Sequence, residues 1–85
     1  MIIVTKYYGK TCAPCISVGR ILEKVKKVVN FELVQIEVNQ HPLQATQANV
    51  TQIPTITIQK DGIEVNRWSG VKSSREIAEI LENYI

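Results

Sequence analysis

Residues 11–15 have the sequence Thr-Cys-Ala-Pro-Cys and contain the only two cysteines of the chain. The residues before them, 2–8, are β-branched and aromatic and are followed by a glycine, a pattern that predicts a buried strand. From residue 13 to residue 29 apolar side chains recur at helical spacing, with a proline in the first turn. We therefore expect both thiols at the N-terminal end of a helix.

That position favours reactive cysteines. A thiol at a helix start lies beside unpaired backbone N–H groups and the positive end of the helix dipole, and both favour the thiolate that attacks disulfides. Cys12, nearer the helix end, is expected to be the exposed nucleophile, and Cys15 the more buried thiol that resolves a mixed disulfide. Residues three apart share a helix face, which suits this exchange. Pro14 stiffens the loop, and together with Ala13 it should tune the reduction potential.

Size and composition limit the class of protein. The 85 residues make one domain, residues 1–85, and 45% hydrophobic with 21% charged residues is ordinary globular composition. The net charge of +2 is too small to indicate nucleic-acid binding. Lys6 interrupts the apolar N-terminal run too early for a signal peptide or a membrane span. We expect a cytoplasmic monomer, and in that compartment a cysteine pair is more often catalytic or metal-binding than structural.

The rest of the chain predicts three more strands and two more helices. Strands are predicted at residues 31–38, 55–60 and 63–68, and helices at residues 43–48 and from Ser73 onward. Asp61-Gly62 forms the centre of a hairpin, and Ser73 with Glu76 forms a capping box. The order β-α-β-α-β-β-α implies a parallel first pair and an antiparallel terminal hairpin. We predict an α/β fold with a mixed four-stranded sheet flanked by helices.

The two longer helices have apolar stripes. The first stripe comprises Val18, Ile21, Leu22, Val25, Val28 and Val29, and the last comprises Ile77, Ile80, Leu81 and Tyr84. Gly19 within the first helix costs about 1 kcal/mol relative to alanine, so we expect another element to approach it closely. Lys24, Lys26 and Lys27 are expected on a solvated face of the same helix.

This order of elements, with Cys-x-x-Cys at the first strand-to-helix junction and Ile53-Pro54-Thr55 before the third strand, resembles the thioredoxin family over nearly the whole chain. Gly70, after the fourth strand, adds to the resemblance. The resemblance implies a cis bond before Pro54 and a substrate-binding edge formed by Ile53, Pro54, Thr55 and Gly70. The backbone of Ile53 would pair with an extended peptide of the substrate.

The resemblance also implies an activity, namely a thioredoxin-like protein-disulfide oxidoreductase that carries electrons in cell redox homeostasis. It would hold no bound cofactor. An external reductase, either thioredoxin reductase-like or glutathione, would recharge the Cys12–Cys15 disulfide.

The chain departs from the thioredoxin pattern near the cysteines. It lacks the leading strand and helix, Thr11 replaces the usual tryptophan, and Ala13 replaces the usual glycine. Lys6 stands where the family has a buried carboxylate, whose lysine partner falls near Gln35. Tyr8 matches an aromatic position that supports the active site. Lys6 either extends from the strand end to solvent or lies beneath the cysteines and stabilises a thiolate.

Other interpretations remain open. A glutaredoxin-type, glutathione-dependent reductase fits the chain's size and Tyr8, but residues 68–73 lack the usual Gly-Gly pair followed by acidic residues. A non-catalytic interaction module would use the apolar patch around Ile53 and Gly70, although it would need no thiols.

A structural zinc ion usually needs about four Cys or His ligands. The two cysteines and His41 could form such a site only in a dimer, and we predict no metal, no nucleic acid and no membrane partner. His41 is expected to serve the turn into the second helix, and Trp68 is expected to pack.

Overall fold

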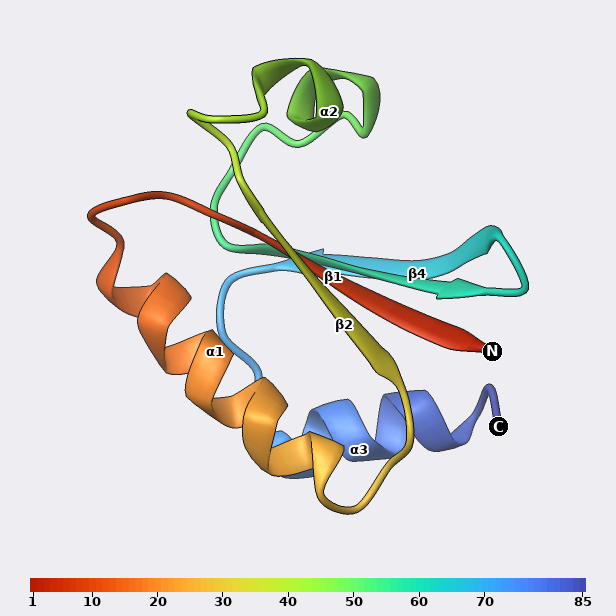
Figure 1. The fold of residues 1–85 in the computed structure, drawn as a ribbon. Helices are drawn as coiled ribbons and strands as arrows, with labels where there is room; N and C mark the ends of the chain where they lie inside the picture. Colours follow the sequence, from red (N-terminus) through yellow and green to blue (C-terminus); the bar gives the residue numbers. More distant parts are fainter.

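A computed structural model describes all residues, Met1–Ile85, as four strands and three helices (Figure 1). In chain order these are β1 (Ile2–Tyr8), α1 (Ala13–Lys26), β2 (Glu32–Glu37), α2 (Pro42–Gln47), β3 (Thr55–Lys60), β4 (Ile63–Ser69) and α3 (Ser74–Glu82). The sheet has the order β2-β1-β3-β4, with β1 parallel to β2 and the other pairs antiparallel. The predicted fold is confirmed. None of the helices combines the length and the apolar character that crossing a bilayer requires.

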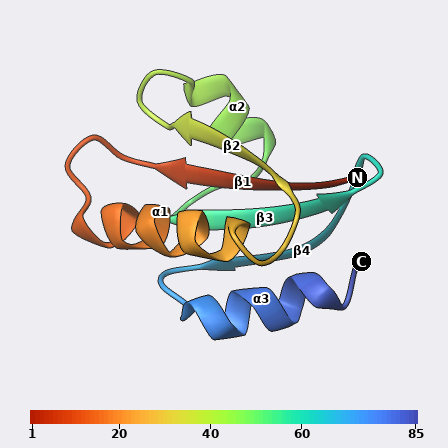
Figure 2. The same ribbon diagram turned by 60° about the horizontal axis from the view of Figure 1, so that its bottom comes forward.

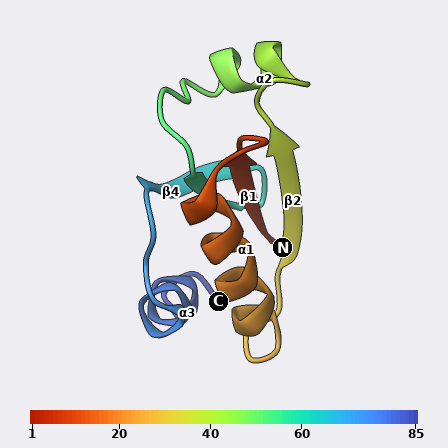
Figure 3. The same ribbon diagram turned by 90° about the vertical axis from the view of Figure 1, so that its left-hand side faces the viewer.

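The helices cover the two faces of the sheet unequally. Figures 2 and 3 show α1 and α3 side by side under one face, and α2 on the opposite side, beyond the end of β2. The core between the sheet and the α1–α3 layer includes Val4, Leu22, Ile56 and Ile77, each 0% exposed. Burying each such side chain contributes about 1.5–3 kcal/mol, so this layer supplies most of the hydrophobic stabilisation.

Two local predictions are confirmed by the backbone. Asp61 and Gly62 have positive φ values of 52° and 84°, as a two-residue hairpin turn between β3 and β4 requires. At the start of α3 the Glu76 N–H donates to Ser73 Oγ at 3.1 Å, and the Ser73 N–H donates to Glu76 Oε1 at 3.2 Å. This capping box satisfies donors that would otherwise be unpaired.

The predicted end of the first helix is wrong. The helix α1 ends at Lys26, and Val28, which we placed in the apolar stripe, is 78% exposed. The Val28 N–H donates to the Val25 carbonyl three residues back, which tightens the last turn and rotates the valine outward. Val29 is buried as predicted. Tyr84 lies just beyond α3, where its hydroxyl donates to the Val65 carbonyl at 3.2 Å.

Candidate functional site

The two cysteines form a disulfide at the N-terminus of α1, with their Cα atoms 5.2 Å apart. Cys12 is the N-cap residue, and its Sγ accepts the Cys15 N–H at 3.2 Å. A thiolate on Cys12 would accept the same hydrogen bond and face the positive end of the helix dipole. The first turn contains no acidic side chain that would oppose this charge. The cap position therefore favours the thiolate form of Cys12.

The two sulfur-bearing residues differ in exposure. Cys15 is 2% exposed, whereas Cys12 is half-buried and is flanked by the exposed residues Thr11, Ala13 and Pro14. A substrate disulfide can therefore approach Cys12 from solvent, while Cys15 is shielded behind it.

Gly9 brings a distant loop to Cys12. A Cβ added to Gly9 would lie 2.5 Å from Ile53 Cδ1 and 3.9 Å from Cys12 Cβ, so both side chains border the same point. Any side chain at this position would displace Ile53. The sequence indicates Gly9 only as the end of a strand, because nothing local shows that residue 53 packs there.

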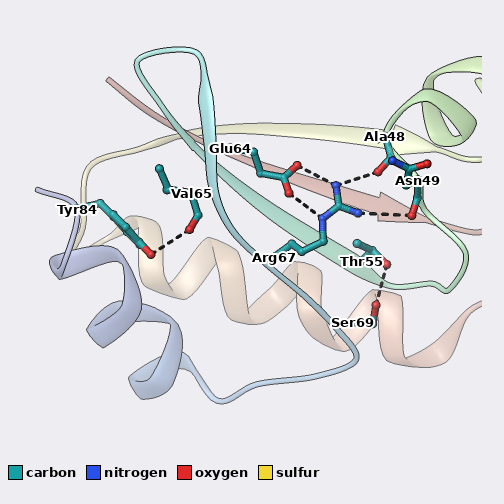
Figure 4. Close-up of polar contacts among 8 residues, drawn as sticks. All are labelled: Ala48, Asn49, Thr55, Glu64, Val65, Arg67, Ser69 and Tyr84. Carbon is teal, nitrogen blue, oxygen red and sulfur yellow. Dashed lines mark hydrogen bonds and ion pairs between the residues drawn. The ribbon is translucent and has the colours of Figure 1, made fainter.

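The predicted substrate-binding residues come together at the ends of β3 and β4. The Ile53–Pro54 peptide bond is cis, as the resemblance implied, and the Gly70 N–H donates to the Pro54 carbonyl at 2.9 Å. The Thr55 hydroxyl lies 3.0 Å from Ser69 Oγ (Figure 4). It also lies 2.6 Å from the Gln52 carbonyl. Thr55 is 3% exposed, so its side chain supports the loop, while Ile53 is 39% exposed.

Lys6 lies beneath the first turns of α1. It is 7% exposed, and its Nζ lies 4.8 Å from the centre of the Tyr8 ring. A Cβ on Gly19 would lie 2.9 Å from that Nζ, so the predicted close approach to Gly19 is confirmed and the approaching group is the lysine. Gly19 follows Cys15 by one helical turn. The ammonium therefore lies about one turn below the buried cysteine.

The charge of Lys6 has no anionic partner in contact. Lys6 makes neither an ion pair nor a hydrogen bond. Desolvation lowers its pKa below the usual value, and the more distant carboxylate of Glu23 opposes this shift in part. Gln35 is its neighbour in the β1–β2 register. The adjacent positions where thioredoxins carry an acid and a lysine thus hold a lysine and an amide here.

Arg67 joins two distant segments of the chain, and nothing in the sequence pattern predicts this. Its guanidinium donates two hydrogen bonds of 2.8 Å to Glu64, one of 2.8 Å to the Ala48 carbonyl and a longer one of 3.5 Å to the Asn49 carbonyl (Figure 4). It thereby ties β4 to the end of α2, where the loop toward Ile53 begins. No sequence motif marks this role, because the two carbonyls belong to a segment that is distant along the chain.

His41 and Tyr7 have ordinary surroundings, and Trp68 has one unsatisfied polar group. His41 is the exposed N-cap residue of α2 and makes no side-chain cap hydrogen bond. Trp68 packs against the core as predicted, although its buried indole N–H has no acceptor. Tyr7 is 8% exposed, and desolvation raises its pKa. The structure contains no group of three or more His, Cys, Asp or Glu side chains placed to hold a metal ion.

Known proteins match this chain over most of its length. The thioredoxin family model matches residues 1–83. The thioredoxin of Chlamydia caviae is 27% identical over 84 residues, covering 98% of this chain and 82% of that protein. The thioredoxin of Listeria monocytogenes is 27% identical over 86 residues, covering 99% of this chain and 84% of that protein.

Solved structures show a similar likeness. The Fasciola hepatica thioredoxin superimposes with a TM-score of 0.88 at 28% identity, covering 99% of this chain and 81% of that one. A mutant thioredoxin from Halobacterium salinarum reaches a TM-score of 0.92 at 20% identity, covering 98% of this chain and 74% of that one, which demonstrates a shared fold.

Proposed function

The chain belongs to the thioredoxin family and is a thiol–disulfide oxidoreductase, and we propose that Cys12 is its attacking thiol and Cys15 its resolving thiol. The observation that carries this assignment is the cap position of Cys12, whose sulfur accepts the Cys15 N–H at 3.2 Å. That contact stabilises a thiolate on Cys12 and on no other residue of the chain.

The reaction transfers two electrons to the substrate. The Cys12 thiolate attacks one sulfur of the substrate disulfide, the substrate S–S bond breaks, and the second substrate sulfur leaves as a thiolate that takes a proton. Cys15 then loses its proton and attacks Cys12 Sγ. The mixed disulfide breaks, the substrate leaves as a dithiol, and the enzyme keeps the Cys12–Cys15 disulfide. An external reductase returns the two electrons.

Protein substrates would dock beside Cys12. In this proposal an extended peptide pairs with the backbone of Ile53, next to Pro54, and passes the Gly70 turn. The exposed side chains of Ile53 and Val71 provide apolar contact around this edge. The enzyme acts as a cytoplasmic monomer in electron transport and redox homeostasis, and it needs no bound cofactor.

Lys6 would influence the acidity of the Cys12–Cys15 thiols. We propose that its ammonium, about one helical turn below Cys15, stabilises the thiolate form of the cysteine pair. Two opposite charges about one to two helical turns apart, partly open to solvent, interact by on the order of 1 kcal/mol. We therefore expect Lys6→Met to raise a thiol pKa by about one unit. Thiol titration of the two reduced proteins checks this, and unchanged pKa values would remove the role.

Insulin reduction with dithiothreitol tests the cysteine assignment. Cys12→Ser should abolish the catalysed reaction, whereas Cys15→Ser, reduced and then freed of dithiothreitol, should trap a mixed disulfide with its target. Ser17→Ala, an exposed change two residues from Cys15, is the control and should keep full activity. If Cys12→Ser were as active as the wild type, the assignment would be wrong, and a non-catalytic interaction module would be favoured.

The electron donor separates the thioredoxin-type function from the glutaredoxin-type alternative. NADPH-linked thioredoxin reductases and glutathione should be compared as the sole source of electrons for the Cys12–Cys15 disulfide. We expect turnover with a reductase. Turnover with glutathione alone would support the alternative.

A further inference from the structure

A groove runs along the side of the molecule, between α1 and the edge strand β2. It is lined by Lys6, Ile16, Gly19, Arg20, Glu23, Lys24, Lys27, Leu33 and Gln35. The groove starts at Ile16, beside Cys15, and extends away from the cysteines along the helix. Because Gly19 has no side chain, Lys6 can reach the floor of the groove from β1. This surface is separate from the edge at Ile53 that the proposed reaction uses.

The groove concentrates positive charge. Four cations and one carboxylate line it, whereas the whole chain has a net charge of only +2. Arg20, Lys24 and Lys27 are exposed, and none of them forms an ion pair. Lys6 is 7% exposed, has no ion pair and borders the groove. The Lys6 side chain is largely desolvated and its Nζ, which reaches the groove, has no partner, so an incoming anion would recover part of the free energy of desolvation.

The adjacent strand offers hydrogen bonds as well. In the sheet order β2-β1-β3-β4, β2 pairs only with β1, so its outer edge has free backbone N–H and carbonyl groups (Figure 3). The other free edge, on β4, differs in charge, because its Arg67 is already paired with Glu64 at 2.8 Å. Only the β2 edge combines free backbone groups with uncompensated cations.

The spacing of the cations favours an extended ligand. Arg20, Lys24 and Lys27 follow one another at intervals of about one helical turn, about 5–6 Å. Alternate side chains of a β-strand point the same way and lie about 6.7 Å apart. A strand with acidic residues at alternate positions would therefore present carboxylates to successive cations of α1.

We propose that this groove binds an extended acidic segment of a partner protein, which adds to the free edge of β2 as a fifth strand. Its backbone pairs with β2. Its acidic side chains on the helix side face Arg20, Lys24 and Lys27, with Lys6 at the floor. The site does not depend on the roles assigned to Cys12 and Cys15, so it can be tested in a protein without thiols.

The probe is a capped, fluorescent peptide of about six residues with alternating glutamate and valine, long enough to match β2. Binding is measured by fluorescence anisotropy to the Cys12→Ser/Cys15→Ser protein at low and at physiological ionic strength. The double variant Arg20→Gln/Lys24→Gln should weaken binding by about tenfold, with a larger effect at low salt. The matched control is Lys26→Gln, an exposed lysine of the same helix outside the groove, and it should leave binding unchanged.

The position of the peptide is tested by hydrogen exchange. The proposal requires slower exchange at amides of β2 and no change at β4. The proposal would be overturned if a peptide with glutamine in place of glutamate bound as tightly as the acidic peptide. It would also be overturned if Lys26→Gln weakened binding as much as the double variant, or if the peptide slowed amide exchange at β4. Displacement of the peptide by inorganic phosphate at the peptide's own concentration would indicate a simple anion site, and dimerisation of the protein through β2 would indicate a second copy as the occupant.

Discussion

Lys6 and Arg67 lie on opposite faces of the same sheet and have opposite surroundings. Arg67 is in register with Thr57 and Thr5, whereas Lys6 is in register with Ile56 and projects toward α1. The hydrogen bond to Glu64 raises the pKa of Arg67, and desolvation lowers the pKa of Lys6. Arg67 is a cation whose hydrogen bonds join β4 to the end of α2. Lys6 has no ion pair, so its charge is free for the two roles proposed above, toward the thiols and toward an acidic ligand.

The largest expected effect comes from removing the partnered cation. Arg67→Met breaks the ion pair with Glu64 and the hydrogen bonds to the carbonyls at the end of α2. Charge-assisted hydrogen bonds contribute about 1.5–3 kcal/mol when buried, but this side chain is 35% exposed, so we expect a loss of about 1–2 kcal/mol. Urea unfolding followed by circular dichroism measures it.

Arg75→Met is the matched control for that comparison. Arg75 also pairs with a glutamate, Glu79 at 3.2 Å, but its side chain is 90% exposed and it contacts no backbone carbonyl. We expect a change of about 0.5 kcal/mol or less. If the two variants lost the same free energy of unfolding, the hydrogen bonds to Ala48 and Asn49 would contribute nothing to the fold.

Removing the unpartnered cation, Lys6, should change the free energy of unfolding by a smaller amount and in the opposite direction, toward higher stability. Lys6→Met retains the length of the side chain and removes a desolvated charge, so we expect a gain of about 1 kcal/mol near neutral pH. The pKa of Lys6 in the folded protein lies below its unfolded value. Deprotonation therefore favours folding, and the wild type should gain stability relative to Lys6→Met as the pH rises toward about 10.5.

Urea unfolding of both proteins at neutral and at alkaline pH tests this prediction. The comparison between the two proteins cancels the titration of the other groups. Lys26→Met, a change of an exposed lysine, should show no such pH dependence. If Lys6→Met were less stable than the wild type at neutral pH, the contact of Lys6 with the Tyr8 ring would outweigh the cost of desolvating its charge.

The fold was predictable from the sequence wherever the cause is local. Asp61-Gly62 specifies its turn by conformational preference, and Ser73 with Glu76 specifies a helix start through two hydrogen bonds within one turn. The end of α1 was missed by three residues, because Val28 fits the apolar spacing and only the tightened last turn turns it outward. Helix ends depend on where the chain must go next, which periodicity does not record.

The site was predictable in its residues and less so in its contacts. The position of Cys12 as a helix cap follows from the strand-to-helix pattern. Two contacts join segments that are far apart in the sequence, so no residue spacing predicts them. They are the contact between Ile53 and Gly9 and the hydrogen bond from Arg67 to the end of α2. Gly19 was partly predictable. The free-energy cost of a glycine within a helix indicates a close neighbour, but it does not identify that neighbour as Lys6.

The smallest expected effect on stability is that of Gly19→Ala, which tests the contact between residue 19 and Lys6. Gly19→Ala should gain up to about 1 kcal/mol from helix propensity, but the new Cβ would lie 2.9 Å from Lys6 Nζ. The lysine end can shift, so in the wild type we expect a net change within about 0.5 kcal/mol. In a Lys6→Val background the conflict is gone, and the same change should stabilise by about 1 kcal/mol.

A double-mutant cycle from four urea unfolding curves gives the coupling between residues 6 and 19. We expect about 0.5–1 kcal/mol, the low end of the range of about 0.5–3 kcal/mol found for residues in contact. Gly19→Ala should also displace the ammonium from the floor of the groove, and so shift the thiol pKa in the same direction as Lys6→Met. An equal effect of Gly19→Ala on stability in both backgrounds would show that the glycine makes no room for the lysine, and the unpartnered charge would then need another explanation.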